Sequence, residues 1–148
     1  MIKRMILLCC CLGLSACDQL KVSPVSLEGE PIVGHWFVEQ RDQIGSEMFF
    51  QRLYLHIRAD GYVRYVNLLC RSYENQLRNE SRLNLDYTPV KRITVKKMVL
   101  QRFPLTPKFI LSLGQWPDEN NGIFEVDKLP LAQIESNQLP DFDAWQCE

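Results

Sequence analysis

The chain has 148 residues, of which 46% are hydrophobic and 24% are charged, with 17 basic against 18 acidic residues. This length suits a single domain. Because the two signs of charge nearly balance and form no basic tail, the composition argues against a nucleic-acid-binding surface, which would need clustered Lys and Arg.

The first 16 residues have the layout of a secretory signal peptide. Lys3 and Arg4 supply a positive start, residues 5–14 form an apolar run, and Ser15 and Ala16 supply small residues before a cut. The apolar run is far shorter than the roughly 20 residues that a transmembrane helix needs. We therefore expect residues 1–16 to be cleaved, which leaves 15 basic against 18 acidic residues and a net charge of −3.

The residues at this cut, Leu14-Ser15-Ala16-Cys17, resemble the lipobox of bacterial lipoprotein precursors. The resemblance implies that the Cys17 thiol is diacylated, that the chain is cut before Cys17, and that the new amine is acylated. An ordinary signal peptide with a cysteine near its cut is the alternative. Two or more acyl chains make membrane anchoring stable, so we expect a lipid-anchored protein of the bacterial cell envelope that faces the periplasm. Asp18-Gln19 resembles the inner-membrane retention signal of enterobacterial lipoproteins and favours the inner over the outer membrane.

A flexible tether is expected to follow the anchor. Residues 18–31 hold two prolines, one glycine and three acidic residues without a clear period. We therefore divide the chain into a signal peptide at 1–16, a lipidated Cys17 and tether at 17–31, and a β-rich domain at 32–148.

The clearest local structure in the domain is a β-hairpin around Ala59-Asp60-Gly61. Apolar and polar residues alternate on both sides of this loop, and the glycine stands where a left-handed residue is wanted. Pairing of Arg58 with Tyr62 sets the register and places His56 opposite Arg64.

The rest of the domain also favours strands. Residues 71–82 are polar and lose the alternation, which predicts a loop or a short helix. Further strands are expected at 32–40, 83–87, 93–103, 109–116 and 123–126, with shorter candidates at 129–135 and 142–147. Short strands separated by turn signals, such as the PDENNG stretch at 117–122, predict an all-β fold: a single antiparallel barrel or sandwich of about seven to nine strands.

Gly34-His35-Trp36 resembles the Gly-x-Trp motif that opens lipocalin-like barrels, in which the Trp plugs the closed end. The resemblance implies a barrel and makes Gly34 and Trp36 candidates for a barrel plug or for lining a ligand site. The chain departs from the family in two ways. The basic partner of the Trp near the C-terminus has no candidate, because Lys128 is the last basic residue, and Asp86-Tyr87 matches a second family motif only in part.

Two cysteines, Cys70 and Cys147, remain in the mature domain after Cys17. In an oxidising compartment an even pair predicts a disulfide. It would close a loop of about 77 residues and contribute about 4 kcal/mol in the chain-entropy model. Two isolated thiols or a redox pair are the alternatives, although the Cys-x-x-Cys spacing typical of a redox pair is absent.

The titratable residues do not predict a catalytic or metal site. His35 and His56 are the only histidines and are expected on separate strands, whereas a metal site needs several ligands. Asp141, Asp143 and Glu148 could pair as general acid and base, but a solvated tail is the simpler interpretation. We therefore expect no metal, no cofactor and no enzymatic activity.

An aromatic and aliphatic set, Phe50, Tyr54, Val66 and Leu68, falls on the hairpin face that also carries arginines. A partly apolar outer face predicts binding of a partner or packing of a second layer. Burial under residues 71–82 is the alternative. The sequence thus predicts a non-enzymatic, membrane-anchored lipoprotein that binds another envelope protein as an accessory, inhibitor or immunity factor. The alternative is a lipocalin-like carrier or sensor of a small apolar ligand.

Overall fold

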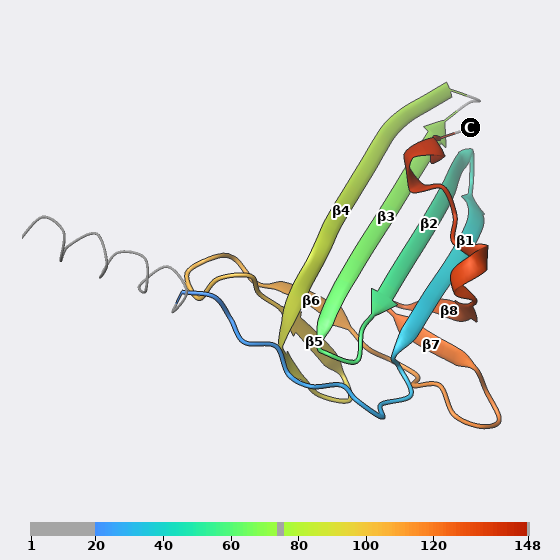
Figure 1. The fold of residues 1–148 in the computed structure, drawn as a ribbon. Coiled ribbons are helices and arrows are strands. Elements are labelled where there is room, and N and C mark those ends of the chain that lie inside the picture. The colour runs from blue at the N-terminus through green and yellow to red at the C-terminus, as the bar shows by residue number, and fades with distance from the viewer. Residues whose placement is uncertain (1–19, 74–75, 148) are drawn as a thin grey trace, which may run out of the picture.

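The computed structural model describes residues 20–73 and 76–147, and the described chain is all-β (Figure 1). Its strands are β1 (Gly34–Ile44), β2 (Glu47–Ile57), β3 (Tyr62–Tyr73), β4 (Gln76–Ile93), β5 (Lys97–Leu100), β6 (Phe109–Ser112), β7 (Ile123–Val126) and β8 (Leu129–Ile134). Two short 3₁₀ helices follow, η1 (Ser136–Gln138) and η2 (Phe142–Ala144). The all-β prediction is confirmed, while the signal peptide and the residues Cys17, Asp18 and Gln19 lie outside the described part.

The strands form one antiparallel sheet in the order β6-β5-β4-β3-β2-β1-β8-β7. The two ends of this order meet, because Leu113 just after β6 forms a bridge with Val126 of β7. Next to this bridge, the Gly114 amide donates to the Glu125 carbonyl at 2.9 Å and the Asp127 amide to the Ser112 carbonyl at 2.8 Å. The sheet therefore curls into a barrel-like shape around a single apolar interior.

Side chains of the inward-facing positions fill this interior. The buried members are Leu27, Ile32, Trp36, Leu53, Leu55, Ile57, Val63, Tyr65, Val90, Met98, Leu100, Leu111, Leu113, Phe124, Val126, Leu129 and Leu131. Trp36 is at the centre: its ring meets Phe124 edge-on at 5.4 Å, and its Nε1 donates to the Ile32 carbonyl at 2.8 Å. The second bond satisfies the indole donor, which burial would otherwise leave without water.

Four strands continue beyond the barrel. β1 pairs with β8 only over residues 35–37, and β4 pairs with β5 only over residues 90–93, whereas β1–β4 pair with one another along nearly their full length. Figure 1 shows the upper halves of these four strands projecting together from the barrel. We call this part, residues 38–53, 67–73 and 76–84, the extension.

The hairpin prediction is confirmed. The Arg58 amide donates to the Tyr62 carbonyl at 2.9 Å, and His56 lies opposite Arg64. Gly61 has a φ of +84°, the left-handed conformation that the loop requires.

Three local predictions are wrong. The described part of the stretch 71–82 is not a loop or helix: residues 71–73 end β3, residues 76–82 begin β4, and the two strands pair antiparallel. Its polar composition fits a strand that has no neighbour on its other side, since natural edge strands are commonly polar or charged. The expected strand at 93–103 turns back at residues 94–96, where the Thr94 amide bonds to the Lys97 carbonyl at 2.9 Å, and residues 142–147 contain η2 instead of a strand.

The free tether is also shorter than residues 18–31. The amides of Val25 and Leu27 donate to the carbonyls of Val90 and Ala59, each at 2.9 Å, and the Leu27 side chain is buried in the core. A Cβ added to Gly61 would lie 1.9 Å from the Val25 carbonyl oxygen, so the segment passes directly over the hairpin loop. The domain therefore begins well before Ile32.

Candidate functional site

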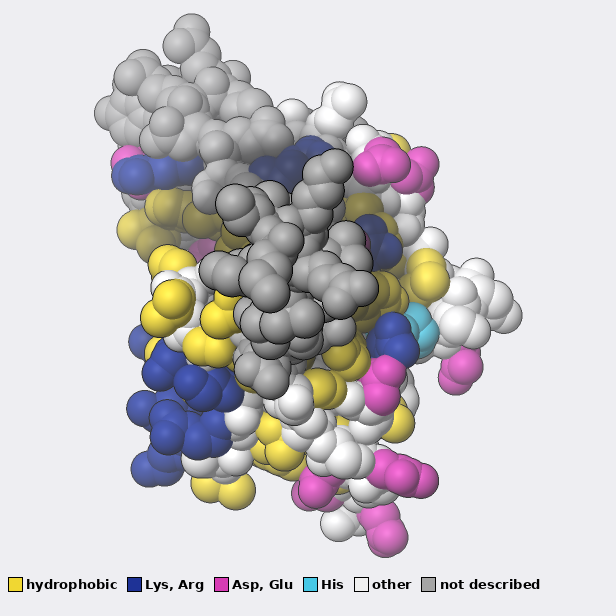
Figure 2. Space-filling view, turned by 60° about the vertical axis from the view of Figure 1, so that its left-hand side comes forward, with side chains coloured by type: hydrophobic (Ala, Val, Ile, Leu, Met, Phe, Trp, Pro, Cys, Tyr) yellow, Lys and Arg dark blue, Asp and Glu magenta, His cyan; other side chains and the backbone are white. Residues whose placement is uncertain are grey.

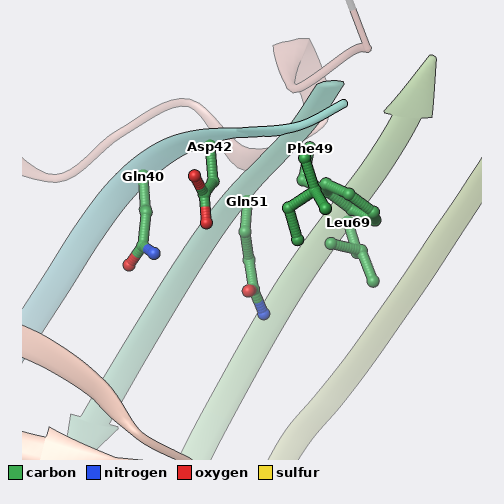
Figure 3. A pocket seen from close by; sticks show the side chains of 6 residues that line it. Gln40, Asp42, Phe49, Gln51 and Leu69 are labelled. Carbon is green, nitrogen blue, oxygen red and sulfur yellow. The ribbon is translucent and has the colours of Figure 1, made fainter. Parts of the chain in front are cut away.

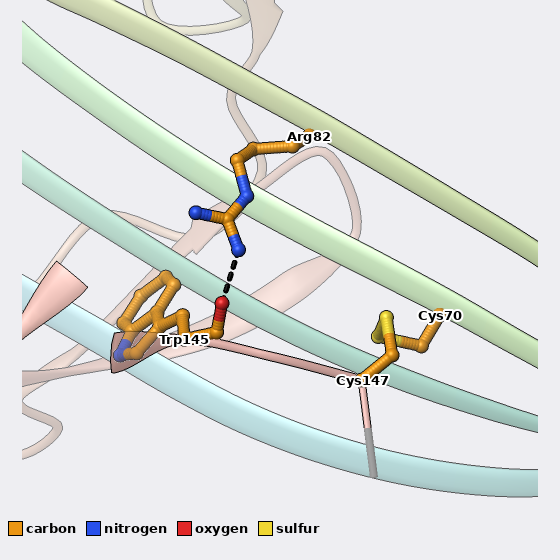
Figure 4. The surroundings of a disulfide bond; sticks show 4 residues. All are labelled: Cys70, Arg82, Trp145 and Cys147. Atoms are coloured by element: carbon orange, nitrogen blue, oxygen red, sulfur yellow. Dashed lines mark hydrogen bonds between the residues drawn. A yellow bond between two sulfur atoms is a disulfide. The ribbon is translucent and has the colours of Figure 1, made fainter. Parts of the chain in front are cut away.

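The outer face of the extension is covered by the chain's own C-terminal segment (Figure 4). A disulfide joins Cys70 of β3 to Cys147, with the Cα atoms 5.6 Å apart. Next to it, the ring of Phe142 packs on Tyr54 at 4.4 Å between centroids, and Trp145 is buried in the same cluster. The two cysteines that the sequence singled out thus fasten this segment to the sheet.

This cover overturns the expected partner patch. Tyr54, Val66 and Leu68 are buried, and Phe50 packs partly buried at the edge of their cluster. The sequence pattern correctly indicated an apolar outer face. Its second layer, however, is residues 142–147 rather than a partner or the stretch 71–82.

Arginines on the outer face hold the C-terminal segment in place. Arg64 lies over the ring of Phe142 at 5.0 Å, and Arg52 lies over Trp145 at 5.9 Å. Arg82 donates to the Trp145 carbonyl (Figure 4). Guanidinium groups over aromatic faces are attracted by the ring quadrupole, so these contacts add to the disulfide.

The expected acidic cluster at the C-terminus has a structural role in the described residues. The Asp141 carboxylate accepts from the Asp143 amide at 3.2 Å and caps η2. Both carboxylates are exposed. Glu148 lies outside the described part of the chain.

The inner face of the extension has no such cover among the described residues. Figure 3 shows Gln40 and Asp42 of β1, Phe49 and Gln51 of β2 and Leu69 of β3 on the same face of the sheet. With Ile44, which is 65% exposed, they line a shallow hollow of about 210 Å³. Because side chains alternate along a strand, this face continues the line of the barrel interior, and we call it the inner face of the extension.

Polar contacts hold the rim of this face in order. The Gln51 amide nitrogen donates to Asn67 Oδ1 at 3.1 Å. Arg71 binds both carboxylate oxygens of Glu47, with its Nη2 2.6 Å from Oε1, and lies over the ring of Phe49 at 5.5 Å. The inner face therefore combines exposed apolar side chains with oriented polar ones.

The two histidines lie on separate strands, as expected, but the pairing of these strands brings them together. His35 of β1 lies opposite His56 of β2, and their rings stack 3.8 Å apart. His35 Nδ1 is 2.8 Å from the Tyr54 hydroxyl, and His56 Nδ1 is 2.7 Å from the Tyr87 hydroxyl. The signal that could have revealed this cluster is the two-residue loop Gly45-Ser46, a hairpin dipeptide that pairs Ile44 with Glu47 and so sets His35 opposite His56.

The surroundings of the two histidines favour their uncharged forms near neutral pH. Burial, with the charges of His35, Arg58 and Arg64, lowers the pKa of His56 to about 4. Burial also lowers the pKa of His35 and raises the pKa of Tyr54 to about 12. Across residues 20–73 and 76–147, no group of three or more His, Cys, Asp or Glu side chains is placed to hold a metal ion.

A third feature is a hollow of about 520 Å³ at the mouth of the barrel, where β4 separates from the β5–β6 connection. Its lining includes Leu85, Leu100, Phe103 and Phe109. Gln101 also lines it and is only 2% exposed. The Gln101 Nε2 donates to two backbone carbonyls at 2.9 and 3.1 Å, while its Oε1 is buried without a partner in the described chain.

Comparison of the chain with protein-family models, with curated proteins and with solved structures finds no match in any of the three. Within the described ranges, no helix is long and apolar enough to cross a membrane.

Proposed function

We propose that this chain is a non-enzymatic lipoprotein of the bacterial cell envelope that binds another envelope protein through the inner face of the extension. Cys17 supplies the lipid anchor, on the resemblance of Leu14-Ser15-Ala16-Cys17 to a lipobox. Asp18 and Gln19 favour the inner membrane. The partner makes the chain an accessory, inhibitor or immunity factor.

The observation that carries the proposal is that the outer face of the extension is covered by another part of the described chain, whereas the inner face is not. A sheet buries its apolar face against another layer, and the outer face does so through residues 142–147. The inner face leaves Ile44, Leu69 and Leu83 exposed. Contiguous exposed apolar groups rimmed by polar side chains are typical of protein interaction sites.

The composition of the inner face favours a protein occupant. Phe49 and Leu69 offer apolar contact, whereas Gln40, Asp42 and Gln51 offer hydrogen bonds to a partner's backbone and side chains. Interfaces between proteins that also exist apart are mixed in this way, with aromatic and apolar groups beside satisfied polar ones. The Glu47–Arg71 ion pair keeps the rim ordered before binding, which lowers the entropy cost of association.

The test is affinity capture from envelope extract with the purified mature protein. We expect a stoichiometric protein partner to be recovered. The double variant Ile44→Asp with Leu69→Asp should lose it, while Leu139→Asp, also at an exposed apolar position but outside the extension, should keep it. Recovery of the same partner by all three proteins would refute the role of the inner face, and recovery of none would refute the proposal.

A second candidate function is binding of a small, mostly apolar ligand, which the Gln101 hollow favours. The two bonds of Nε2 fix the orientation of the amide, and Oε1 is buried beside the hollow as an acceptor without a donor in the described chain. A buried acceptor without a donor costs about 1–3 kcal/mol. A ligand with an apolar body and one hydroxyl or amide donor would relieve this cost.

Native mass spectrometry of the purified protein tests the second function. A co-purifying small molecule that is lost in Gln101→Met and in Phe109→Ala would support it. If the wild-type protein carries no small molecule after gentle isolation from its own membranes, the second function is refuted.

A further inference from the structure

The charges of this chain are segregated along the sequence in a way that the net charge conceals. Residues 87–117 contain six basic residues and no acidic one. Residues 118–147 contain seven acidic residues and one basic residue, Lys128. A near-neutral domain therefore carries two halves of opposite sign.

The fold gathers the basic half on one side of the barrel. The six basic residues lie at the end of β4, in the following turn, on β5 and in the β5–β6 connection: Lys91, Arg92, Lys96, Lys97, Arg102 and Lys108. All six are exposed, and none takes part in the ion pairs of the described residues, which join Glu39 to Arg52, Arg58 to Asp60 and Glu47 to Arg71. Figure 2, which brings this side of the molecule forward, shows Lys and Arg side chains clustered at the lower left and Asp and Glu side chains mostly toward the right.

The same segment carries unusually exposed apolar side chains. Leu105 is 92% exposed, Val95 is 70% exposed and Ile110 is 53% exposed. Such side chains among solvated lysines and arginines are typical of surfaces that lie in the interfacial layer of a membrane, where apolar groups enter the headgroup region and basic groups meet lipid phosphates. We call residues 91–110 with these side chains the basic side.

The chain enters the domain at this side. The Val22 amide donates to the Arg102 carbonyl at 3.3 Å, so the first described residues lie against the β5–β6 connection. Cys17 precedes Val22 by five residues, and a fully extended chain of that length spans at most about 17 Å. A lipid on Cys17 therefore holds the backbone at Arg102 within about two Debye lengths of the headgroups at physiological salt.

We propose that the basic side of the barrel docks onto the anionic lipid headgroups of the membrane that holds the anchor. This inference rests on the lipid anchor of the proposed function. Acylation alone tethers the domain and leaves it free to tumble, whereas docking of the basic side fixes its orientation. The partner in this interaction is the bilayer surface itself, recognised by charge complementarity and by insertion of Leu105 and its exposed apolar neighbours.

Lysine labelling of the reconstituted lipoprotein tests the orientation. The protein purified from membranes is inserted into phosphatidylcholine vesicles, with or without phosphatidylglycerol, and the rate of acylation of each lysine is measured by mass spectrometry. We expect Lys91, Lys96, Lys97 and Lys108 to react at least about fivefold more slowly on the anionic vesicles, the factor that one basic residue contributes near an anionic surface. The vesicles of phosphatidylcholine alone are the control, on which these four lysines should react as fast as in detergent solution.

Vesicle binding by the chain from Asp18 onward gives a second measurement that does not need the anchor. This chain keeps the whole core, which begins at Leu27. Its partition onto phosphatidylglycerol vesicles should fall about fivefold in Lys97→Gln and should be unchanged in Arg41→Gln, which removes the same charge from an exposed position of the extension. The difference should disappear at high salt, because screening removes it.

The outcomes separate this inference from the anchor. An acylated Cys17 with equal labelling of all lysines on both vesicles overturns docking and leaves the anchor standing. A mature N-terminus without lipid overturns the anchor. In that case, vesicle binding by the chain from Asp18 onward still tests whether the basic side binds anionic lipid. If the lysines are labelled equally on both vesicles but are protected from labelling in intact envelopes, the basic side binds a protein rather than lipid, and the proposal is overturned.

Discussion

The sharpest test of the fold is the substitution Gly61→Ala, compared with Gly45→Ala. Both glycines lie in hairpin loops and both have a positive φ, +84° and +63° respectively. Placing a Cβ in this conformation costs about 1–2 kcal/mol at either position. The surroundings differ: a Cβ at Gly45 meets nothing within 4 Å, whereas one at Gly61 would lie 1.9 Å from the Val25 carbonyl oxygen.

The additional cost at Gly61 follows from what must move. Displacing the N-terminal segment breaks two backbone hydrogen bonds, Val25 to Val90 and Leu27 to Ala59, each with a net value of about 1 kcal/mol. It also exposes part of the buried Leu27 side chain, which contributes about 2 kcal/mol when fully buried. Gly61→Ala should therefore lower the free energy of unfolding by about 3–4 kcal/mol more than Gly45→Ala.

Urea unfolding followed by circular dichroism measures this difference. The midpoint should shift far more for Gly61→Ala, and hydrogen exchange should accelerate at the amides of Val25 and Leu27 in that variant only. Equal free energies of unfolding for the two variants, within about 0.5 kcal/mol, would show that residues 22–27 do not lie over the hairpin, and the short tether derived from that contact would fall with it.

Three further outcomes follow from the described contacts. The double variant Cys70→Ser with Cys147→Ser should lose about 4 kcal/mol of stability in urea unfolding and bind a hydrophobic dye at the uncovered outer face. Because the folded pKa of His56 lies at about 4, below the ordinary 6.5, the unfolded chain binds the extra proton first. The free energy of unfolding should therefore decrease as the pH falls from about 6.5 to about 4, by about 1–1.5 kcal/mol after allowance for the partly exposed ring, and this part should vanish in His56→Gln. Trp36→Phe should cost about 2–3 kcal/mol, because it leaves the Ile32 carbonyl without its donor and opens space in the core; an unchanged urea midpoint would contradict the central position of this ring.

The features that the sequence predicted correctly depend on few residues close together in the chain. The hairpin at Gly61 follows from one loop with a left-handed position between alternating segments. The disulfide follows from elimination, because only Cys70 and Cys147 remain once the cysteines of the expected signal peptide and the expected lipidation site are set aside. The all-β class follows from alternation summed over many segments, so single errors such as the break at residues 94–96 did not change it.

The features that were missed depend on distant residues. The polar stretch 76–82 forms a strand because β3 supplies a pairing partner. Its polar composition is typical of an edge strand, which has no second neighbour. The histidine pair depends on the register of β1 against β2, and one residue of slip would move each ring to the opposite face. The cover over Tyr54 depends on where residues 142–147 return, which no local pattern specifies.

The point where the chain enters the barrel, next to the proposed anchor, connects the two proposed surfaces. The chain enters beside Arg102, at the barrel, while the turn between β1 and β2 closes the far end of the extension (Figure 1). The 11 residues of β2 span about 36 Å at the usual rise along a strand. If the basic side lies on the bilayer, the inner face of the extension takes a fixed orientation relative to the lipid. Loss of docking should then weaken partner capture on membranes without changing it in detergent solution, because only on the membrane does the orientation of the inner face matter.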